Sequence, residues 1–408
     1  MSQRLTVKKR NEQASGTVAF CGTRGIPANY GGFETAVDEI TKRFVGEKID
    51  TLVFCRSSNL ESTASEHDGR KLIFTSGSTI RALDTFVASF QTGLYLLKHR
   101  KAFRFTFWFN NANLPGILLT RIAGIPMAVN TDGLEWRRAK WSWPFKLYYW
   151  LSSWLIARIC KTLIADSHGI RDYYRTHFSA DSEFIPYGAP ESKAIETKSV
   201  TAILRHYGVE SGRFFLQITR IEPDNLPLET STAFASTSLS CEGFRFIIIG
   251  YKDATPYALR LKQLEGISGV SVCPAEYDAE TLAVLRSHCF AYVHGNSVGG
   301  TNPALLEAMA TCPRILAIDS PFSKEVLREL AVFFDPANIA PGFGRVVSLP
   351  DQRESLSQRV RERYSWDRVA ASYRNLLDGK PAKYESIVEF SMLSSRMASA
   401  VHESQSVK

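Results

Sequence analysis

The sequence predicts an α/β protein with two doubly wound domains, each a parallel sheet covered by helices on both faces. Short apolar segments alternate with helix-length segments through the first half of the chain, and the same alternation begins again in the second half. This pattern is typical of parallel sheets with crossover helices. The chain has 408 residues, more than one ordinary core accommodates, and 44% of them are hydrophobic, so two large cores are expected.

The strands are predicted from short, apolar, β-rich segments. In the first half these are Val18–Cys21, Thr51–Cys55, Lys71–Thr75, Phe105–Phe109, Pro126–Asn130 and Leu163–Ala165. In the second half they are Phe214–Thr219, Phe244–Gly250, Val270–Cys273, Phe290–His294 and Arg314–Ile318. A helix is expected after the first strand, because Phe33, Val37, Ile40 and Phe44 recur at helical spacing.

These segments divide the chain into expected parts. Residues 16–188 form an amino-terminal domain, residues 201–365 a carboxyl-terminal domain, and residues 189–200, which carry little apolar content, a linker. Residues 1–15, with Lys8-Lys9-Arg10, are expected to be a disordered basic arm. A helix at 366–378 is expected to return to the amino-terminal domain, and a serine-rich tail follows at 379–408.

Charge and cysteine usage narrow the class of protein. The net charge of +8 favours anionic partners such as nucleotide diphosphates, polyprenyl phosphates or acidic membranes, whereas the one short basic cluster is too small to indicate nucleic-acid binding. The seven cysteines are scattered and lack a C-x-x-C pair, which favours reduced thiols in the cytoplasm over a disulfide or zinc framework. Neither a signal peptide nor an apolar run of about 18–20 residues is visible.

A glycine-rich loop separates the first expected strand from the first expected helix. It contains four glycines within eleven residues, Gly22, Gly25, Gly31 and Gly32, more than one turn requires for geometry. Loops at this point of a doubly wound domain present backbone N–H groups where anionic ligands bind. We therefore predict that Gly31 and Gly32 allow close approach of a phosphate.

Two charged residues of the same loop are further candidates. Arg24 offers positive charge, and Glu34 could polarise a substrate hydroxyl. A dinucleotide-binding loop is the competing interpretation, but G-x-G-x-x-G is absent and no acidic residue ends the second strand. A turn that needs its glycines only for geometry is the structural alternative.

The segment Tyr292–Ala310 holds the most informative candidate site. A strand ends, a glycine-rich turn follows, and Pro303 is expected at the first position of a helix, where its fixed φ is favourable. The free N–H groups of Gly300, Thr301 and Asn302 are then predicted to point at a diphosphate.

Two charged side chains complete this site. Glu307 lies about one turn further along a helix otherwise made of Ala, Leu and Met, so it either faces solvent or accepts hydrogen bonds from a specific group such as ribose hydroxyls. Arg220, at the end of the strand Phe214–Thr219, is placed to neutralise phosphate charge, and a plain surface arginine is the alternative.

The segment Pro303–Ala310 resembles the carboxyl-terminal motif of the retaining glycosyltransferases of family 4, in which Glu-Gly-Phe-Gly-x-Pro precedes Glu-Ala-Met-Ala. Further segments look like a bacterial, rhamnosyltransferase-like branch of that family, namely Gly22–Thr35, Asp132–Trp141, Ala165–Ser167, Ile185–Gly188 and Gly299–Pro303. The resemblance spans roughly residues 16–378.

The resemblance implies a GT-B fold, with two Rossmann-like domains facing each other across a cleft, the first on the acceptor side and the second binding the donor nucleotide. It implies transfer of a sugar, with retention, from a nucleotide-diphosphate sugar to a glycan or lipid-linked acceptor in bacterial cell-surface polysaccharide synthesis. The branch suggests dTDP-rhamnose as donor. By the same resemblance Glu307 would bind the ribose, Arg220 the diphosphate, and Gly31 and Gly32 the phosphates from the other side.

Retention in this family implies a front-face displacement, in which the departing phosphate helps to deprotonate the acceptor. Asp132 is then our candidate for contacting the reacting sugar or acceptor, and Glu135 and Trp136 are further acceptor-side candidates. No D-x-D motif is visible, so we expect neither a metal nor another cofactor. Two departures from the family motif stand out: Ser297-Val298-Gly299 replaces the first glutamate, and Asn225 replaces a lysine that usually follows the arginine.

The segment Trp136–Trp154 combines five Trp and two Tyr with several basic residues. Such a mixture suits peripheral contact with an anionic membrane, here the inner face of the cytoplasmic membrane, although the aromatic residues could equally fill a core. Other functions stay open as well. A sugar-nucleotide epimerase would share the fold, a catalytically silent nucleotide-sugar-binding protein would lack turnover, and an NAD-dependent dehydrogenase is the weakest alternative.

Overall fold

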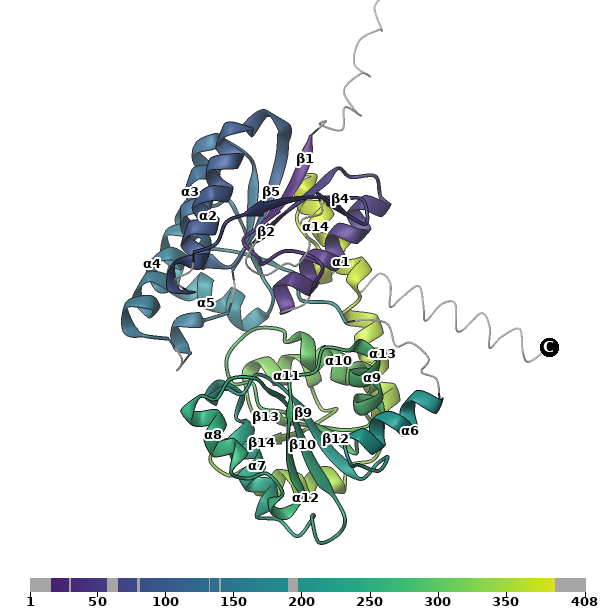
Figure 1. The fold of residues 1–408 in the computed structure, drawn as a ribbon. Coiled ribbons are helices and arrows are strands. Elements are labelled where there is room, and N and C mark those ends of the chain that lie inside the picture. Colours follow the sequence, from purple (N-terminus) through teal and green to yellow (C-terminus); the bar gives the residue numbers. More distant parts are fainter. Residues whose placement is uncertain are drawn as a thin grey trace, which may run out of the picture. The chain divides into compact units, whose positions relative to one another are not determined.

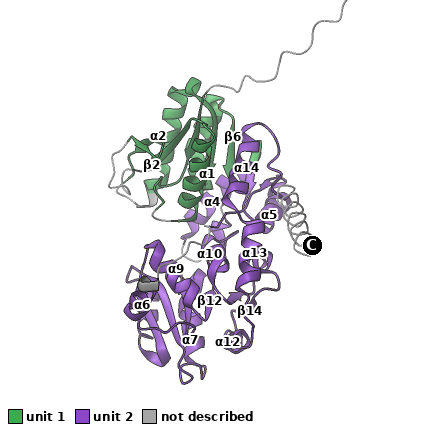
Figure 2. Cartoon of the chain, turned by 90° about the vertical axis from the view of Figure 1, so that its right-hand side faces the viewer, with its two compact units in different colours: residues 1–130, 158–162 green, residues 131–157, 163–408 purple. Residues whose placement is uncertain are grey.

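The computed structural model describes residues 16–28, 31–56, 65–78, 81–131, 133–138, 141–189 and 197–385. The chain divides into two compact units, residues 1–130 with 158–162 and residues 131–157 with 163–408 (Figure 2). None of the helices in the described ranges has the length and apolar character that a membrane span requires. All seven cysteines fall within these ranges and are free thiols.

The first sheet contains a parallel core of strands with one short antiparallel edge strand (Figure 1). Its strands are β1 (Thr17–Cys21), β2 (Thr51–Arg56), β3 (Glu66–His67), β4 (Arg70–Thr75), β5 (Phe103–Phe109), β6 (Met127–Asn130), β7 (Thr162–Ala165) and β8 (Glu183–Phe184), in the order β3-β4-β2-β1-β5-β6-β7-β8. The helices of this part of the chain are α1 (Gly32–Gly46), α2 (Arg81–Lys98), α3 (Leu114–Ala123), α4 (Trp143–Ile159) and α5 (His168–Phe178).

The second sheet is parallel at every pairing and belongs wholly to the second unit. Its strands are β9 (Phe214–Ile218), β10 (Arg245–Tyr251), β11 (Val270–Pro274), β12 (Ala291–His294), β13 (Ile315–Ile318) and β14 (Val332–Phe334), in the order β11-β10-β9-β12-β13-β14. The accompanying helices are α6 (Thr197–His206), α7 (Pro227–Ala235), α8 (Pro256–Lys262), α9 (Ala279–His288), α10 (Pro303–Thr311), α11 (Pro321–Leu327), α12 (Ala340–Val347), α13 (Arg353–Arg363) and α14 (Trp366–Leu377).

Phenylalanine side chains fill both cores. In the first unit the ring of Phe20 lies 5.1 Å from that of Phe107 and 5.7 Å from that of Phe44, which joins α1 to the sheet. In the second unit Phe215 on β9 packs against Phe343 on α12 at 5.1 Å. Because central parallel strands are buried on both faces, their sequences are continuously apolar, and this explains why they could be found without a clear alternation.

The two parallel sheets confirm the predicted α/β class with two Rossmann-like domains. Each predicted strand is present with slightly different ends, and the predicted helix is α1, where Val37, Ile40 and Phe44 are buried. The strands β3, β8 and β14 were not predicted, because segments this short carry little periodic signal. The basic arm at 1–15, residues 190–196 of the expected linker and residues 386–408 of the expected tail lie outside the described residues.

Candidate functional site

The best-defined candidate site lies at the carboxyl edge of the second sheet, where the loop after β9 meets the loop after β12. These adjacent strands mark the point at which the strand order of the sheet reverses, since β10 and β11 lie on one side and β13 and β14 on the other. In open α/β sheets, ligands bind in the crevice at this switch point.

The loop after β12 runs from Gly295 to Asn302 and leads directly into α10. Pro303 occupies the first turn of the helix as predicted, and Asn302 is the N-cap, its side chain accepting a hydrogen bond from Ala304 N at 2.9 Å. The backbone N–H groups of Gly300, Thr301 and Asn302 make no hydrogen bond to another described residue. Because the first turn of α10 is already capped by Asn302, these loop N–H groups are the ones left for an anion.

The loop after β9 carries Arg220, which is exposed to solvent. Asn225 is only 2% exposed, and its side-chain amide donates to Arg220 O at 2.9 Å. Asn225 therefore fixes the loop that presents Arg220, and its amide is turned toward the backbone. Asn225, which the resemblance aligned with a lysine, thus has a structural contact in this loop.

The loops after β9 and β12 are joined by Ser297. Both its backbone N–H and its hydroxyl donate to Asp224 O, each at 2.9 Å. Ser297 belongs to the Ser297-Val298-Gly299 segment, which lacks an acidic residue, and it ties the two loops together. Only the structure shows this contact between the two loops.

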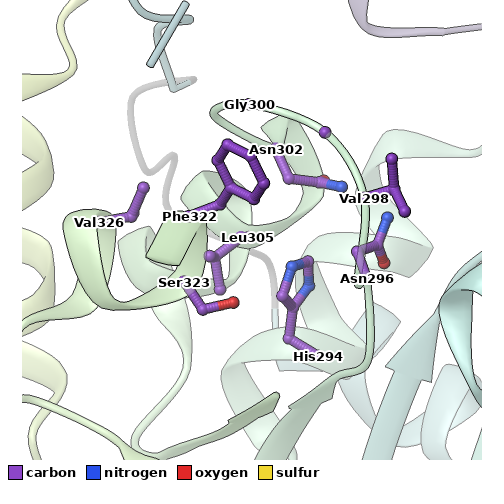
Figure 3. Close-up of a pocket in the computed structure, with 10 residues that line it drawn as sticks. His294, Asn296, Val298, Gly300, Asn302, Leu305, Phe322, Ser323 and Val326 are labelled. Atoms are coloured by element: carbon purple, nitrogen blue, oxygen red, sulfur yellow. The ribbon is translucent and has the colours of Figure 1, made fainter. Parts of the chain in front are cut away.

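The loop and the helices α10 and α11 line a small depression (Figure 3). Its lining comprises His294, Asn296, Val298, Gly299, Gly300, Asn302, Leu305, Phe322, Ser323 and Val326. Burial lowers the pKa of His294 from 6.5 to about 4, because charging the ring would remove hydration that the interior cannot replace. His294 is thus neutral at pH 7 and brings no positive charge to the depression.

Gly300 is required by its contact with Asp166, in the loop after β7. A Cβ atom at Gly300 would lie 1.7 Å from Asp166 Oδ1, closer than any side chain can approach. Beside it, the Thr301 hydroxyl donates to Asp166 O, and both residues belong to the second unit. The Ala165–Ser167 segment and the Gly299–Pro303 segment, which the sequence analysis quoted separately, therefore meet at the backbone.

The carboxylate of Glu307 on α10 is partly buried and forms an ion pair. Arg286 on α9 donates to Glu307 Oε2, with side-chain exposures of 10% for Arg286 and 29% for Glu307. Glu307 Oε1 has no partner among the described residues, so one carboxylate oxygen stays available to a ligand. Arg286 was not among the residues predicted from the sequence. The sequence feature that could have indicated it is its place on the same helix as the apolar residues Val284 and Leu285, which are buried.

A second cation missed from the sequence is Arg138. It is 9% exposed, and a Cβ atom at Gly299 would lie 3.8 Å from its Nη2. Arg138 also forms an ion pair with Glu135. A buried arginine, charge-paired with Glu135, thus lies beside the loop after β12.

The glycine loop of the first unit follows β1, again at a strand-order reversal, between β1 and β5. Glu34 is buried in the first turn of α1 and accepts a hydrogen bond from Arg24 N at 2.9 Å, so it closes the loop on itself. Gly25 has φ +108°, and a Cβ atom there would lie 2.4 Å from Cys55 Sγ, so geometry alone demands this glycine. Gly31 is the N-cap of α1 with extended backbone, and a Cβ atom there would lie 3.1 Å from Glu34 Oε2, while Gly32 is the first residue of α1.

The acceptor-side candidates are held by local contacts. Trp141 Nε1 donates to Glu135 Oε2 at 2.9 Å, and the ring of Trp136 packs 5.7 Å from that of Tyr173. Asp132, the candidate for contacting the reacting sugar, lies outside the described residues.

Comparisons with known proteins place these features in context. A family model described as a domain of unknown function, DUF1972, matches residues 15–190, and no match was found among curated proteins. Among solved structures, sucrose-phosphate synthase from Thermosynechococcus elongatus is similar, with a TM-score of 0.71 and 14% identity over 90% of this chain and 100% of that one.

Two further solved structures show the same likeness over about nine-tenths of the chain. A glycosyltransferase from Rickettsia africae has a TM-score of 0.68 and 12% identity, covering 90% of this chain and 98% of that chain. HepE from Anabaena, in complex with UDP, has a TM-score of 0.68 and 12% identity, covering 89% of this chain and 100% of that chain. At these identities the likeness establishes the fold, which is the two Rossmann-like domains of GT-B glycosyltransferases.

Proposed function

We propose that this protein is a retaining glycosyltransferase that moves a sugar from a nucleotide-diphosphate sugar to an acceptor. The observation that carries the proposal is the loop Gly295–Asn302, at the switch point of the second sheet beside the loop of Arg220. Its Gly300, Thr301 and Asn302 N–H groups have no partner among the described residues. An anion-binding loop at a sheet switch point suits a nucleotide diphosphate. The GT-B fold and the resemblance to family 4 support the same function.

Each charged residue has a proposed task in this reaction. The loop N–H groups of Gly300, Thr301 and Asn302, together with Arg220, stabilise the charge that develops on the departing diphosphate. Glu307 uses its unpartnered Oε1 to accept hydrogen bonds from ribose hydroxyls, while Arg286 holds Oε2 and fixes the carboxylate. No side-chain nucleophile is assigned, because a front-face displacement lets the leaving phosphate take the acceptor proton.

The glycine loop after β1 and the segment after β6 also have proposed tasks in the reaction. Arg24, Gly31 and Gly32 contact the phosphates, Glu34 shapes that loop, and Asp132 contacts the reacting sugar or the acceptor. These assignments follow the resemblance to family 4 and the position of the loop after β1. Glu135 and Trp136 remain acceptor-side candidates, although both already make local contacts.

The donor and acceptor are proposed by analogy. The resemblance to a rhamnosyltransferase-like branch favours dTDP-rhamnose as donor, whereas HepE was solved with UDP. Donors with either nucleotide, dTDP or UDP, should therefore be tested. A glycan or lipid-linked acceptor of bacterial cell-surface polysaccharide synthesis follows from the family. The outward face of α4, where Trp143, Leu147, Trp150, Leu151 and Trp154 are exposed, supports work at the inner face of the cytoplasmic membrane.

The test measures nucleotide diphosphate release from UDP-, dTDP-, GDP- and ADP-sugars, with and without a membrane lipid extract. The proposal expects release from one donor, a rise on adding extract, no loss on adding EDTA, and a strong loss in Glu307→Gln. Glu242→Gln is the matched control, because Glu242 is an exposed glutamate just before β10, at the opposite edge of the same sheet. It should behave as wild type.

A catalytically silent nucleotide-sugar-binding protein is the second candidate, favoured by Ser297 standing in place of an acidic residue. Tight nucleotide binding by calorimetry without release from any donor would support it and refute the transferase. Conversion of the donor sugar without any acceptor would instead support the epimerase.

A further inference from the structure

Helix α2 (Arg81–Lys98) of the first unit presents a second apolar stripe to solvent. Leu83, Phe86, Phe90 and Leu94 are 47%, 47%, 45% and 44% exposed. Their spacing of three and four residues places all four on one face of the helix. The stripe is therefore a continuous surface and not a scatter of single exposed residues.

This stripe is separate from the face that α2 uses for the core. Ala88, Ser89, Thr92 and Leu96 are buried, and α2 packs on α3 (Leu114–Ala123) so closely that a Cβ atom at Gly93 would lie 2.9 Å from Gly116 Cα. Figure 1 shows α2 and α3 side by side. The exposed stripe therefore lies on the face of α2 opposite to the one that packs on α3 and the core.

Basic residues continue the stripe at its carboxyl end. Lys98 follows Leu94 by four residues on the same face, and Arg100 and Lys101 come directly after the helix; all three are exposed. None of them forms an ion pair with another described residue. At the other end of the helix, Asp84 is neutralised by its ion pair with Arg56 at 3.0 Å. The surface is thus apolar along its length and positively charged where it ends.

We propose that this surface, Leu83, Phe86, Phe90, Leu94, Lys98, Arg100 and Lys101, docks the protein onto an anionic lipid bilayer. Helices that lie in a membrane interface combine a Phe- and Leu-rich stripe with Lys and Arg that reach the headgroups. From Leu83 to Lys98 the helix extends about 22 Å, and α2 would lie flat with its apolar side chains below the headgroups. The unpaired cations favour anionic lipid over a neutral bilayer or an apolar protein surface.

The inference goes beyond the proposed sugar transfer and can fail independently of it. Flotation is measured with the full chain, without donor or acceptor, on vesicles of phosphatidylcholine alone and of equal parts phosphatidylcholine and phosphatidylglycerol. The wild type should float with the mixed vesicles, weakly with the neutral ones, and less at high salt.

Two α2 variants and one matched control test the assignment. Phe86→Ser/Phe90→Ser removes aromatic rings that would be buried in the bilayer, and Lys98→Glu/Lys101→Glu removes attraction to the anionic headgroups. Because the two contributions are separate, each variant should weaken binding at least about tenfold. Leu259→Ser/Ile267→Ser removes two apolar residues of the second unit that are each 49% exposed, and should bind as wild type. All three variants should keep the thermal unfolding midpoint of the wild type, since the substituted side chains lie at the surface.

Three results would overturn the proposal. The first is no flotation of the wild type with mixed vesicles. The second is unchanged flotation of both α2 variants, which would leave the exposed face of α4 as the membrane contact. The third is a wild type that does not float but forms a dimer in solution that Phe86→Ser/Phe90→Ser dissociates, which would assign the stripe to a second copy of this chain.

Discussion

The ion pair between Arg286 and Glu307 predicts an unequal cost for removing its two members. Arg286 is the more deeply buried partner, with 10% of its side chain exposed against 29% for Glu307. Glu307→Ala leaves a buried guanidinium without its carboxylate, whereas Arg286→Met leaves a carboxylate that water can still reach. Breaking a fully buried pair costs about 3–5 kcal/mol, and partial exposure of Glu307 reduces this. We expect about 2–3 kcal/mol for Glu307→Ala and about 1 kcal/mol for Arg286→Met.

Glu307→Gln separates the structural task of this residue from its proposed binding task. Glutamine keeps an oxygen for Arg286 and loses only the charge, so the free energy of unfolding should fall by about 1 kcal/mol. Urea unfolding of the variants Glu307→Ala, Glu307→Gln and Arg286→Met measures all three values. A larger loss for Arg286→Met than for Glu307→Ala would refute the reasoning, because it would mean that the carboxylate is the group that cannot be hydrated.

Three further predictions concern single positions. Gly25→Ala should lower the free energy of unfolding by about 3 kcal/mol in urea, because φ is +108° and the new Cβ would overlap Cys55 Sγ; an unchanged value would mean that the loop relaxes freely. His294 has its pKa lowered from 6.5 to about 4, so between these values the unfolded chain binds a proton that the folded one does not, and stability should fall by about 3 kcal/mol as the pH drops through this window. Unfolding at pH 7 and pH 4 should show this loss in the wild type and a smaller one in His294→Gln. Asn225→Lys should lower the thermal midpoint without strengthening nucleotide binding, because it buries an ammonium group where an amide holds Arg220 O; tighter binding of a nucleotide diphosphate would contradict this.

The fold could be predicted well from the sequence because central parallel strands are apolar throughout and alternate with helices. The strand Phe214–Ile218 and the helix containing Val37, Ile40 and Phe44 are examples in which pattern and structure agree. The short strands β3, β8 and β14 were not predicted from the sequence. They are strands because they pair with a neighbouring strand, and their own residue patterns do not indicate it. Pro303 was placed at the start of its helix because proline favours that position for local reasons.

The sequence by itself determined the two-sheet architecture, the glycine-rich loops that follow β1 and β12, and the residue types near a candidate diphosphate site, because each depends on local backbone preferences and apolar patterning. Only the tertiary structure decided which side chains meet. Arg286 on one helix pairs with Glu307 on another, and Asp166, in a distant loop, leaves room only for a glycine at position 300. The side chains of Asn225 and Ser297 donate hydrogen bonds to backbone carbonyl groups. Such contacts join residues far apart in the chain, so their partners are fixed by packing in three dimensions.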